Sequence, residues 1–321
     1  MRGLSDTFIY DLKEGSLKSF FDLVKKDSTL NVEIYNNSLR VFYRGYRLFD
    51  ITVKRNKYNF VYTKIKGYWA EKAEILFGNN ENEKRSACHD INNKFLNYYC
   101  VIPYLKGSID GRSVKDEYEV QQIFVRENNV SSVARRNTDY FCVAYEYDYL
   151  PGNRTKGTPD IIAVQFKSDK NERIKGIGRL AVIELKFGDN AISVGSGIKK
   201  HIDDTIEFFK DNNKVKSLKK EAEHLFNQKY ELGLIKSPKK IKVADNKPQY
   251  ILVLANHDPD NGTGENEGIG LYDILKQYEN NVFKNFDLCI AISSAMGYGL
   301  YSDCVLSVEE FLSECKRFVK R

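Results

Sequence analysis

Two apolar segments that carry charged residues constrain the fold of this chain more than any other feature. Residues 160–166 begin with Asp160 and continue as an apolar run, and residues 180–187 place Glu184 and Lys186 inside another. Side chains two positions apart on a strand point to the same face, so Glu184 and Lys186 share one face. Burying a charged group in such an apolar run costs free energy unless an opposite charge or hydrogen bonds offset it. The segments are therefore predicted to be strands whose charged side chains contact a metal, a phosphate or one another.

The segments around these two strands predict an α/β fold. Helical and strand-like patterns alternate from residue 114 onwards. This order predicts a mixed central sheet flanked by helices. The expected helices cover residues 114–128, 198–211, 215–231 and 308–319, and the expected strands cover residues 140–149, 160–166, 180–187, 250–255 and 288–292.

The first third of the chain has a different pattern. Four runs with strand character are separated by turn dipeptides, which predicts an antiparallel β-meander preceded by a short helix at residues 17–26. Residues 70–106 are predicted to be mostly helical, with Gly107 and Gly111 ending the run. We therefore expect an N-terminal region over residues 1–108, for substrate binding or dimerisation, and a second domain over residues 109–321. The four runs are residues 30–36, 39–44, 47–54 and 58–64.

Composition limits the cellular setting and the partners. The chain has no run approaching the roughly 20 apolar residues of a membrane span, and its start does not resemble a secretory signal. None of its six Cys residues forms a CxxC pair, so we expect free thiols in the reducing cytoplasm. A net charge of +6 permits nucleic-acid binding without requiring it.

The charged residues of the two strands suit a hard divalent cation. Mg²⁺ prefers oxygen ligands, usually one or two carboxylates with several waters. Asp160 and Glu184 supply the carboxylates, and a strand carbonyl at Leu185 adds another oxygen. Lys186, on the same face as Glu184, would orient a water or neutralise charge on a phosphate. The sequence thus predicts a Mg²⁺ site, with Mn²⁺ as a substitute for Mg²⁺. The alternative is an ordinary ion pair on a half-exposed strand.

Pro159-Asp160, followed by a hairpin and Glu184-Leu185-Lys186, resembles the PD-(D/E)XK nuclease superfamily. The resemblance covers residues 114–210, about a third of the chain. It implies a restriction-endonuclease-like core in which Asp160 and Glu184 bind Mg²⁺ and Lys186 assists the attacking water. Many members add a Glu from the helix before the three strands, which implies a role for Glu119, with Glu117 as the other candidate.

Several basic residues are candidates for contacts with nucleic acid. Cations in the loop before Asp160 or on the helix after the third strand would hold phosphates, and basic turns of the meander suit backbone contact. The alternative for each is a solvated surface, and the same holds for His201 and Asp204 on that helix. The residues concerned are Arg154, Lys156, Lys200, Arg44 and Arg47.

The functional hypothesis from sequence is a Mg²⁺-dependent nuclease acting on nucleic acid, with DNA favoured, in restriction, phage defence or repair. The chain has no GxxxxGK[ST] loop, so ATP-driven translocation is not expected. A homodimer is compatible with double-strand cutting, which needs two active sites. The alternative is a nucleic-acid-binding or assembly module that keeps a nuclease-like fold without chemistry.

Overall fold

The computed structural model describes twelve stretches of the chain, which form two compact units. The first unit contains Met1–Gln122 and Gln228–Leu234, and the second contains Ile123–Asn227 and Ile235–Arg321. The first unit thus extends past the division at residues 108 and 109 expected from sequence. The described stretches are residues 2–54, 57–63, 85–88, 98–111, 113, 115–130, 138–145, 159–188, 197–256, 271–279, 283–293 and 300–319.

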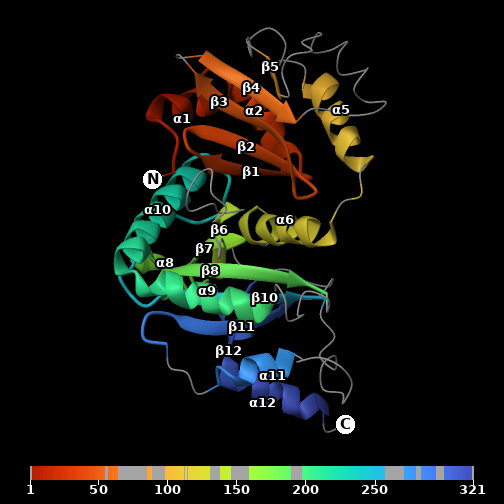
Figure 1. Ribbon diagram of the computed structural model, residues 1–321. Coiled ribbons are helices and arrows are strands. Elements are labelled where there is room, and N and C mark those ends of the chain that lie inside the picture. Colours follow the sequence, from red (N-terminus) through yellow and green to blue (C-terminus); the bar gives the residue numbers. More distant parts are fainter. Residues whose placement is uncertain are drawn as a thin grey trace. The chain divides into compact units, whose positions relative to one another are not determined.

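The first unit is built on an antiparallel sheet whose strands follow one another in sequence order (Figure 1). Its first four strands are the predicted meander, and a fifth strand is added that the sequence did not indicate. Adjacent strands are joined by tight turns at Asn37 and at Arg44-Gly45, where the backbone φ is positive. The strands are β1 (Leu30–Tyr35), β2 (Ser38–Tyr43), β3 (Tyr46–Lys54), β4 (Lys57–Thr63) and β5 (Arg85–Cys88).

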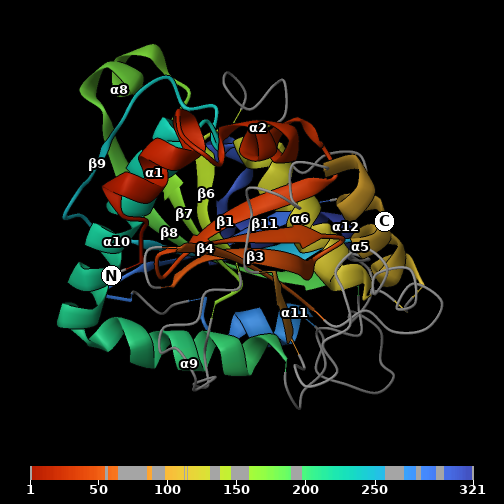
Figure 2. The ribbon, with the colours of Figure 1, turned by 90° about the horizontal axis from the view of Figure 1, so that it is seen from above.

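Two helices, α1 (Asp6–Lys13) and α2 (Lys18–Lys26), cover one face of this sheet (Figure 2). Their aromatic side chains pack on those of the strands: Phe8 contacts Tyr58 with ring centroids 4.9 Å apart, and Phe20 contacts Phe49 at 5.8 Å. Aromatic burial of this kind is a main source of stability for a small sheet. The core of the first unit therefore lies between these helices and the meander.

The helical prediction for residues 70–106 is confirmed at residues 98–106, which lie in helix α5 (Tyr98–Asp110), and is wrong at residues 85–88, which form strand β5. Helix α5 also continues through Gly107 instead of ending before it. Glycine weakens a helix by only about 1 kcal/mol, and the buried side chains of Ile102, Leu105 and Ile109 on this helix outweigh that cost. The remainder of residues 70–97 lies outside the described residues. Helix α6 (Asp116–Asn129) follows.

The second unit is an α/β fold with a mixed sheet, as expected from the sequence (Figure 1). Its strands follow the order β12-β11-β10-β8-β7-β6, and β9 pairs separately with β8. The β6-β7-β8 part is antiparallel, whereas β8, β10 and β11 are parallel. The strands are β6 (Tyr140–Tyr145), β7 (Ile161–Gln165), β8 (Ile177–Phe187), β9 (Lys242–Val243), β10 (Gln249–Ala255), β11 (Asp287–Ser293) and β12 (Leu306–Ser307).

Helices flank this sheet, and α9 (Ile198–Lys210) runs beside β8 (Figure 1). Its side chains at Ile198, Ile202, Thr205 and Phe209 are buried, which is the stripe of an amphipathic helix on a sheet. None of the helices in the described stretches is long and apolar enough to cross a membrane. The other helices of this unit are α8 (Lys170–Lys175), α10 (Asn212–Glu231, of which residues 228–231 belong to the first unit), α11 (Leu271–Lys276) and α12 (Val308–Val319), together with the part of α6 from Ile123 onward.

Candidate active site

The charged residues of strand β8 lie together on one face. The Lys186 Nζ atom is 2.7 Å from Glu184 Oε1, which makes a close ion pair. The exposed fraction of the side chain is 3% for Glu184 and 12% for Lys186. Two charges this deeply buried are tolerated because each has a partner of opposite sign. The pair is thus a buried site and not the half-exposed surface pair that was the alternative.

Asp160 is brought to the same place by the pairing of β7 with β8. Ile161 pairs with Ile183 in antiparallel register, so Asp160, which precedes β7, lies opposite Glu184. The Asp160 Oδ2 atom accepts a hydrogen bond from the backbone N–H of Leu185 at 2.9 Å. The structure therefore brings together Asp160, Glu184 and Lys186, the three residues that the sequence singled out.

His201 on helix α9 completes the cluster. Its Nδ1 atom is 2.9 Å from Glu184 Oε1, and its Nε2 atom is 3.4 Å from Lys186 Nζ. The exposed fraction of its side chain is 28%, against 3% for Glu184, so His201 lies on the solvent-accessible side of the cluster. His201 is therefore part of the polar cluster, and the solvated helix edge that sequence reasoning left open does not describe it.

The cluster changes the ionisation of its members. Burial by itself raises the pKa of Glu184, but the hydrogen bond from His201 and the charge of Lys186 outweigh it and lower that pKa. Tyr250 on β10 lies near Glu184, Asp160 and Thr205, and burial and then the Glu184 charge raise its pKa well above the usual value. Glu184 is thus kept as a carboxylate and Tyr250 as a neutral phenol.

The donor atoms fit a hard cation that keeps several waters. The described residues contain no group of three or more His, Cys, Asp and Glu side chains that would by itself hold a metal ion. Mg²⁺ does not need one, because one or two carboxylates with waters and a phosphate suffice. Asp160 and Glu184, on adjacent strands and opposite one another in register, meet that requirement.

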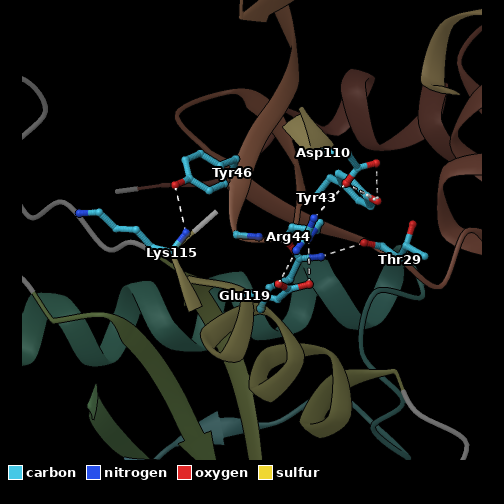
Figure 3. A network of polar contacts seen from close by, with 9 residues as sticks. Thr29, Tyr43, Arg44, Tyr46, Asp110, Lys115 and Glu119 are labelled. Carbon is cyan, nitrogen blue, oxygen red and sulfur yellow. Dashed lines mark hydrogen bonds and ion pairs between the residues drawn. The ribbon is translucent and has the colours of Figure 1, made fainter. Parts of the chain in front are cut away.

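Glu119, for which the resemblance implied a role at the site, has its own partner within the first unit. It belongs to the first unit, where Arg44 Nε and Nη2 donate to its two carboxylate oxygens at 3.0 Å each (Figure 3). This two-point contact is among the strongest pairings of side chains, and it engages both oxygens of Glu119. The cluster of Asp160, Glu184, Lys186 and His201 is made by residues of the second unit alone.

The basic residues predicted to contact nucleic acid fall into three groups. Arg44 also pairs with Asp110, with Nη1 3.1 Å from Oδ1, and Arg47 pairs with Asp50 at 3.5 Å, so both guanidinium groups serve contacts within the first unit. Lys200 is exposed in the first turn of α9, the turn that also carries His201. Arg154 and Lys156 lie outside the described residues.

Sequence reasoning missed Tyr250, although a signal was present. Tyr250 begins the run of residues 250–255, which was interpreted as apolar throughout although this residue carries a polar hydroxyl. In the parallel register Tyr250 pairs with Val182 and Leu252 pairs with Glu184, which places Tyr250 on the face of the cluster. The spacing 198, 202, 206 likewise indicated the face of α9 without indicating which strand it covers.

Comparison with family models, curated proteins and solved structures found no match for this chain.

Proposed function

We propose that this chain is a metal-dependent nuclease of the PD-(D/E)XK type that hydrolyses phosphodiester bonds of nucleic acid, with DNA as the favoured substrate and a cytoplasmic role in restriction, phage defence or repair. The observation that carries the proposal is the buried Glu184–Lys186 pair, with Nζ and Oε1 2.7 Å apart, beside the Asp160 carboxylate that reaches the backbone N–H of Leu185. Two carboxylates and an ammonium on adjacent strands match the chemistry of phosphodiester hydrolysis.

Each residue has a proposed role that follows from its chemistry. Asp160 and Glu184, with the carbonyl of Leu185, would hold Mg²⁺ or Mn²⁺. When bound, the cation lowers the pKa of a water molecule and offsets charge on the phosphate. Lys186 offers an ammonium on the same face as Glu184, where it can donate to the attacking water or to a phosphate oxygen. Lys200, exposed in the same turn of α9 as His201, would contact a neighbouring phosphate.

One observation favours a second function, that of a nucleic-acid-binding or assembly module without chemistry. Glu184 already has Lys186 and His201 as partners, so the cluster is satisfied as it stands. A fully paired buried network can serve a structural role alone. In that case binding would be indifferent to chelator and would persist in the Asp160→Asn variant.

Cleavage assays separate the two functions. Purified protein is incubated with plasmid, single-stranded DNA and RNA, with Mg²⁺, with Mn²⁺ or with EDTA. The nuclease proposal expects cleavage that EDTA abolishes. Asp160→Asn and Lys186→Met should each lower the rate by about 100-fold or more, since each removes a charge from the reacting site.

Lys210→Met is the matched control for Lys186→Met. Lys210 lies in the last turn of α9 and pairs with Glu207, with exposed fractions of 61% and 71%. Its loss should leave the rate unchanged. Binding without cleavage of any substrate by the wild-type chain, unaffected by EDTA, would support the module and refute the nuclease.

A further inference from the structure

We propose that His201 is a positioning residue that holds the Glu184 carboxylate through one ring nitrogen and the Lys186 ammonium through the other. The inference rests on the proposed nuclease function, and it gives His201 a part in metal affinity that is separable from its part in the rate of cleavage. A His on a helix that merely packs would contribute to neither.

The contacts form a closed triangle of three polar groups. Lys186 Nζ and His201 Nδ1 both approach Glu184 Oε1, at 2.7 and 2.9 Å, and His201 Nε2 lies 3.4 Å from Lys186 Nζ. A carboxylate only accepts and an ammonium only donates. The imidazole therefore carries its hydrogen on Nδ1 for Glu184 and presents the lone pair of Nε2 to Lys186.

Helix α9 fixes the ring in this position. Ile198 and Ile202 are fully buried and Thr205 is 7% exposed, so His201, whose side chain is 28% exposed, lies at the edge of the stripe that faces the sheet. The preceding Lys199 and Lys200 are exposed. The helix backbone limits the χ1 rotamers of this side chain, and its contacts with Glu184 and Lys186 select among them. The ring therefore restrains Glu184 and Lys186 at little additional entropic cost.

Two substitutions separate the two contacts. In His201→Asn, the amide nitrogen takes the place of Nδ1 and keeps the hydrogen bond to Glu184, but nothing reaches Lys186. In His201→Gln, the longer side chain places its amide oxygen where Nε2 was, so it accepts from Lys186 and leaves Glu184 with one donor fewer. His201→Ala removes both contacts.

Two measurements report on the two partners. Calorimetry with Mn²⁺ alone, without nucleic acid, reports on Glu184, and kcat at saturating Mn²⁺ reports on Lys186. We expect His201→Asn to keep the Mn²⁺ affinity and lower kcat by about 10-fold or more, and His201→Gln to weaken Mn²⁺ binding by about 10-fold while keeping most of kcat. His201→Ala should lose both.

A matched control and a spectroscopic readout make the outcomes distinct. His224 is a half-buried residue of α10, and His224→Asn should change neither the Mn²⁺ affinity nor kcat. If His201→Asn and His201→Gln lower both quantities equally, or change neither in an active enzyme, the positioning role is refuted. If the wild-type chain neither binds Mn²⁺ nor cleaves, the proposed function fails instead. Independently of activity, ¹⁵N NMR of the metal-free protein should show the Nδ1–H tautomer of His201, and the Nε2–H tautomer would overturn the inference.

Discussion

The second unit contains buried carboxylates with different roles. Glu184 belongs to the candidate site, whereas Asp139 lies outside it. The Oδ1 atom of Asp139 accepts from the backbone N–H of Ser168 at 2.6 Å, and Oδ2 accepts from that of Ser302 at 2.8 Å. One side chain therefore links two segments of the chain that are far apart in sequence. Its role is structural, since both oxygens satisfy backbone donors that burial would otherwise leave unpaired.

Asp139→Asn should destabilise the protein by about 1–3 kcal/mol at pH 7, because the amide group turns a donor toward one of the two backbone donors. Burial raises the pKa of Asp139, but the N–H groups of Ser302 and Ser168 outweigh it and lower that pKa. A lowered pKa gives stability that is complete above the unfolded-state value, about 3.9, and is lost as the pH falls through the folded value. Urea denaturation of both proteins from pH 7 downward measures this.

The difference in unfolding free energy between wild type and Asp139→Asn should stay constant from neutral pH to about pH 5 and shrink below about pH 4. A difference that instead grows as the pH falls would contradict the hydrogen-bonded carboxylate.

At the scale of elements, periodic patterns predicted what local sequence determines. The final helix was predicted at residues 308–319 and observed there, and the meander strands matched within one or two residues, because apolar periodicity and turn dipeptides are local signals. The two-residue strand β9 was not predictable, because its only support is parallel pairing with β8, far away in sequence. Helix α1 had a local signal that was overlooked: Ser5 caps it by accepting from the N–H of Phe8.

The candidate site divides in the same way. Alternation along β8 predicted that Glu184 and Lys186 share a face, and the apolar strands predicted that Asp160 joins them. Local pattern does not show which helix residue reaches that face, so His201 was left open. A role for Glu119 was implied by the resemblance alone, and no pattern along the chain could reveal that Arg44 binds its carboxylate.

The turn between β2 and β3 shows why one glycine is required. Arg44 and Gly45 have φ of 50° and 75°, as a two-residue hairpin turn with both central residues left-handed requires. The Gly45 N–H donates to Gln122 Oε1 at 2.6 Å, and a Cβ on Gly45 would lie 2.4 Å from the backbone oxygen of Tyr118. The turn therefore packs directly against helix α6.

Gly45→Ala should cost clearly more stability than Gly233→Ala. Gly233 also has a positive φ, 70°, but a Cβ there meets nothing within 4 Å. Gly233→Ala should therefore cost only the left-handed backbone strain, about 1–2 kcal/mol, whereas Gly45→Ala adds a clash with backbone. Urea denaturation measures both, and equal losses would show that the turn is free to move away from Tyr118.

At the scale of the whole molecule, the first unit is discontinuous in sequence. It includes Gln228–Leu234, which comprises the end of α10 and the residues directly after it. The Gln228 side chain donates to the carbonyl of Leu4 at 2.8 Å and accepts from its N–H at 2.9 Å. Contacts across more than 200 residues leave no local signature, which is why a boundary drawn from patterns along the chain assigned this segment to the second domain.

A buried ion pair makes the first unit depend on this returning segment. Lys229 Nζ is 2.8 Å from Glu33 Oε2, and the two side chains are only 1% and 4% exposed. Asn31 Nδ2 donates to the other oxygen of Glu33 at 3.0 Å. Removing one partner of a buried ion pair leaves an unpaired charge in a poorly solvated site, whereas replacing both partners by uncharged residues is often tolerated.

Lys229→Met should therefore lower the free energy of unfolding by about 3–5 kcal/mol, because the Glu33 carboxylate stays buried without its cation. The double variant Glu33→Gln with Lys229→Met should recover most of that loss, since Gln still accepts from Asn31 and carries no charge. Urea denaturation of the full chain for the wild type, both single variants and the double variant completes the cycle. A double variant no more stable than Lys229→Met would mean that Lys229 stabilises the first unit through the packing of its methylene groups. The ion pair with Glu33 would then not hold the returning segment against the meander.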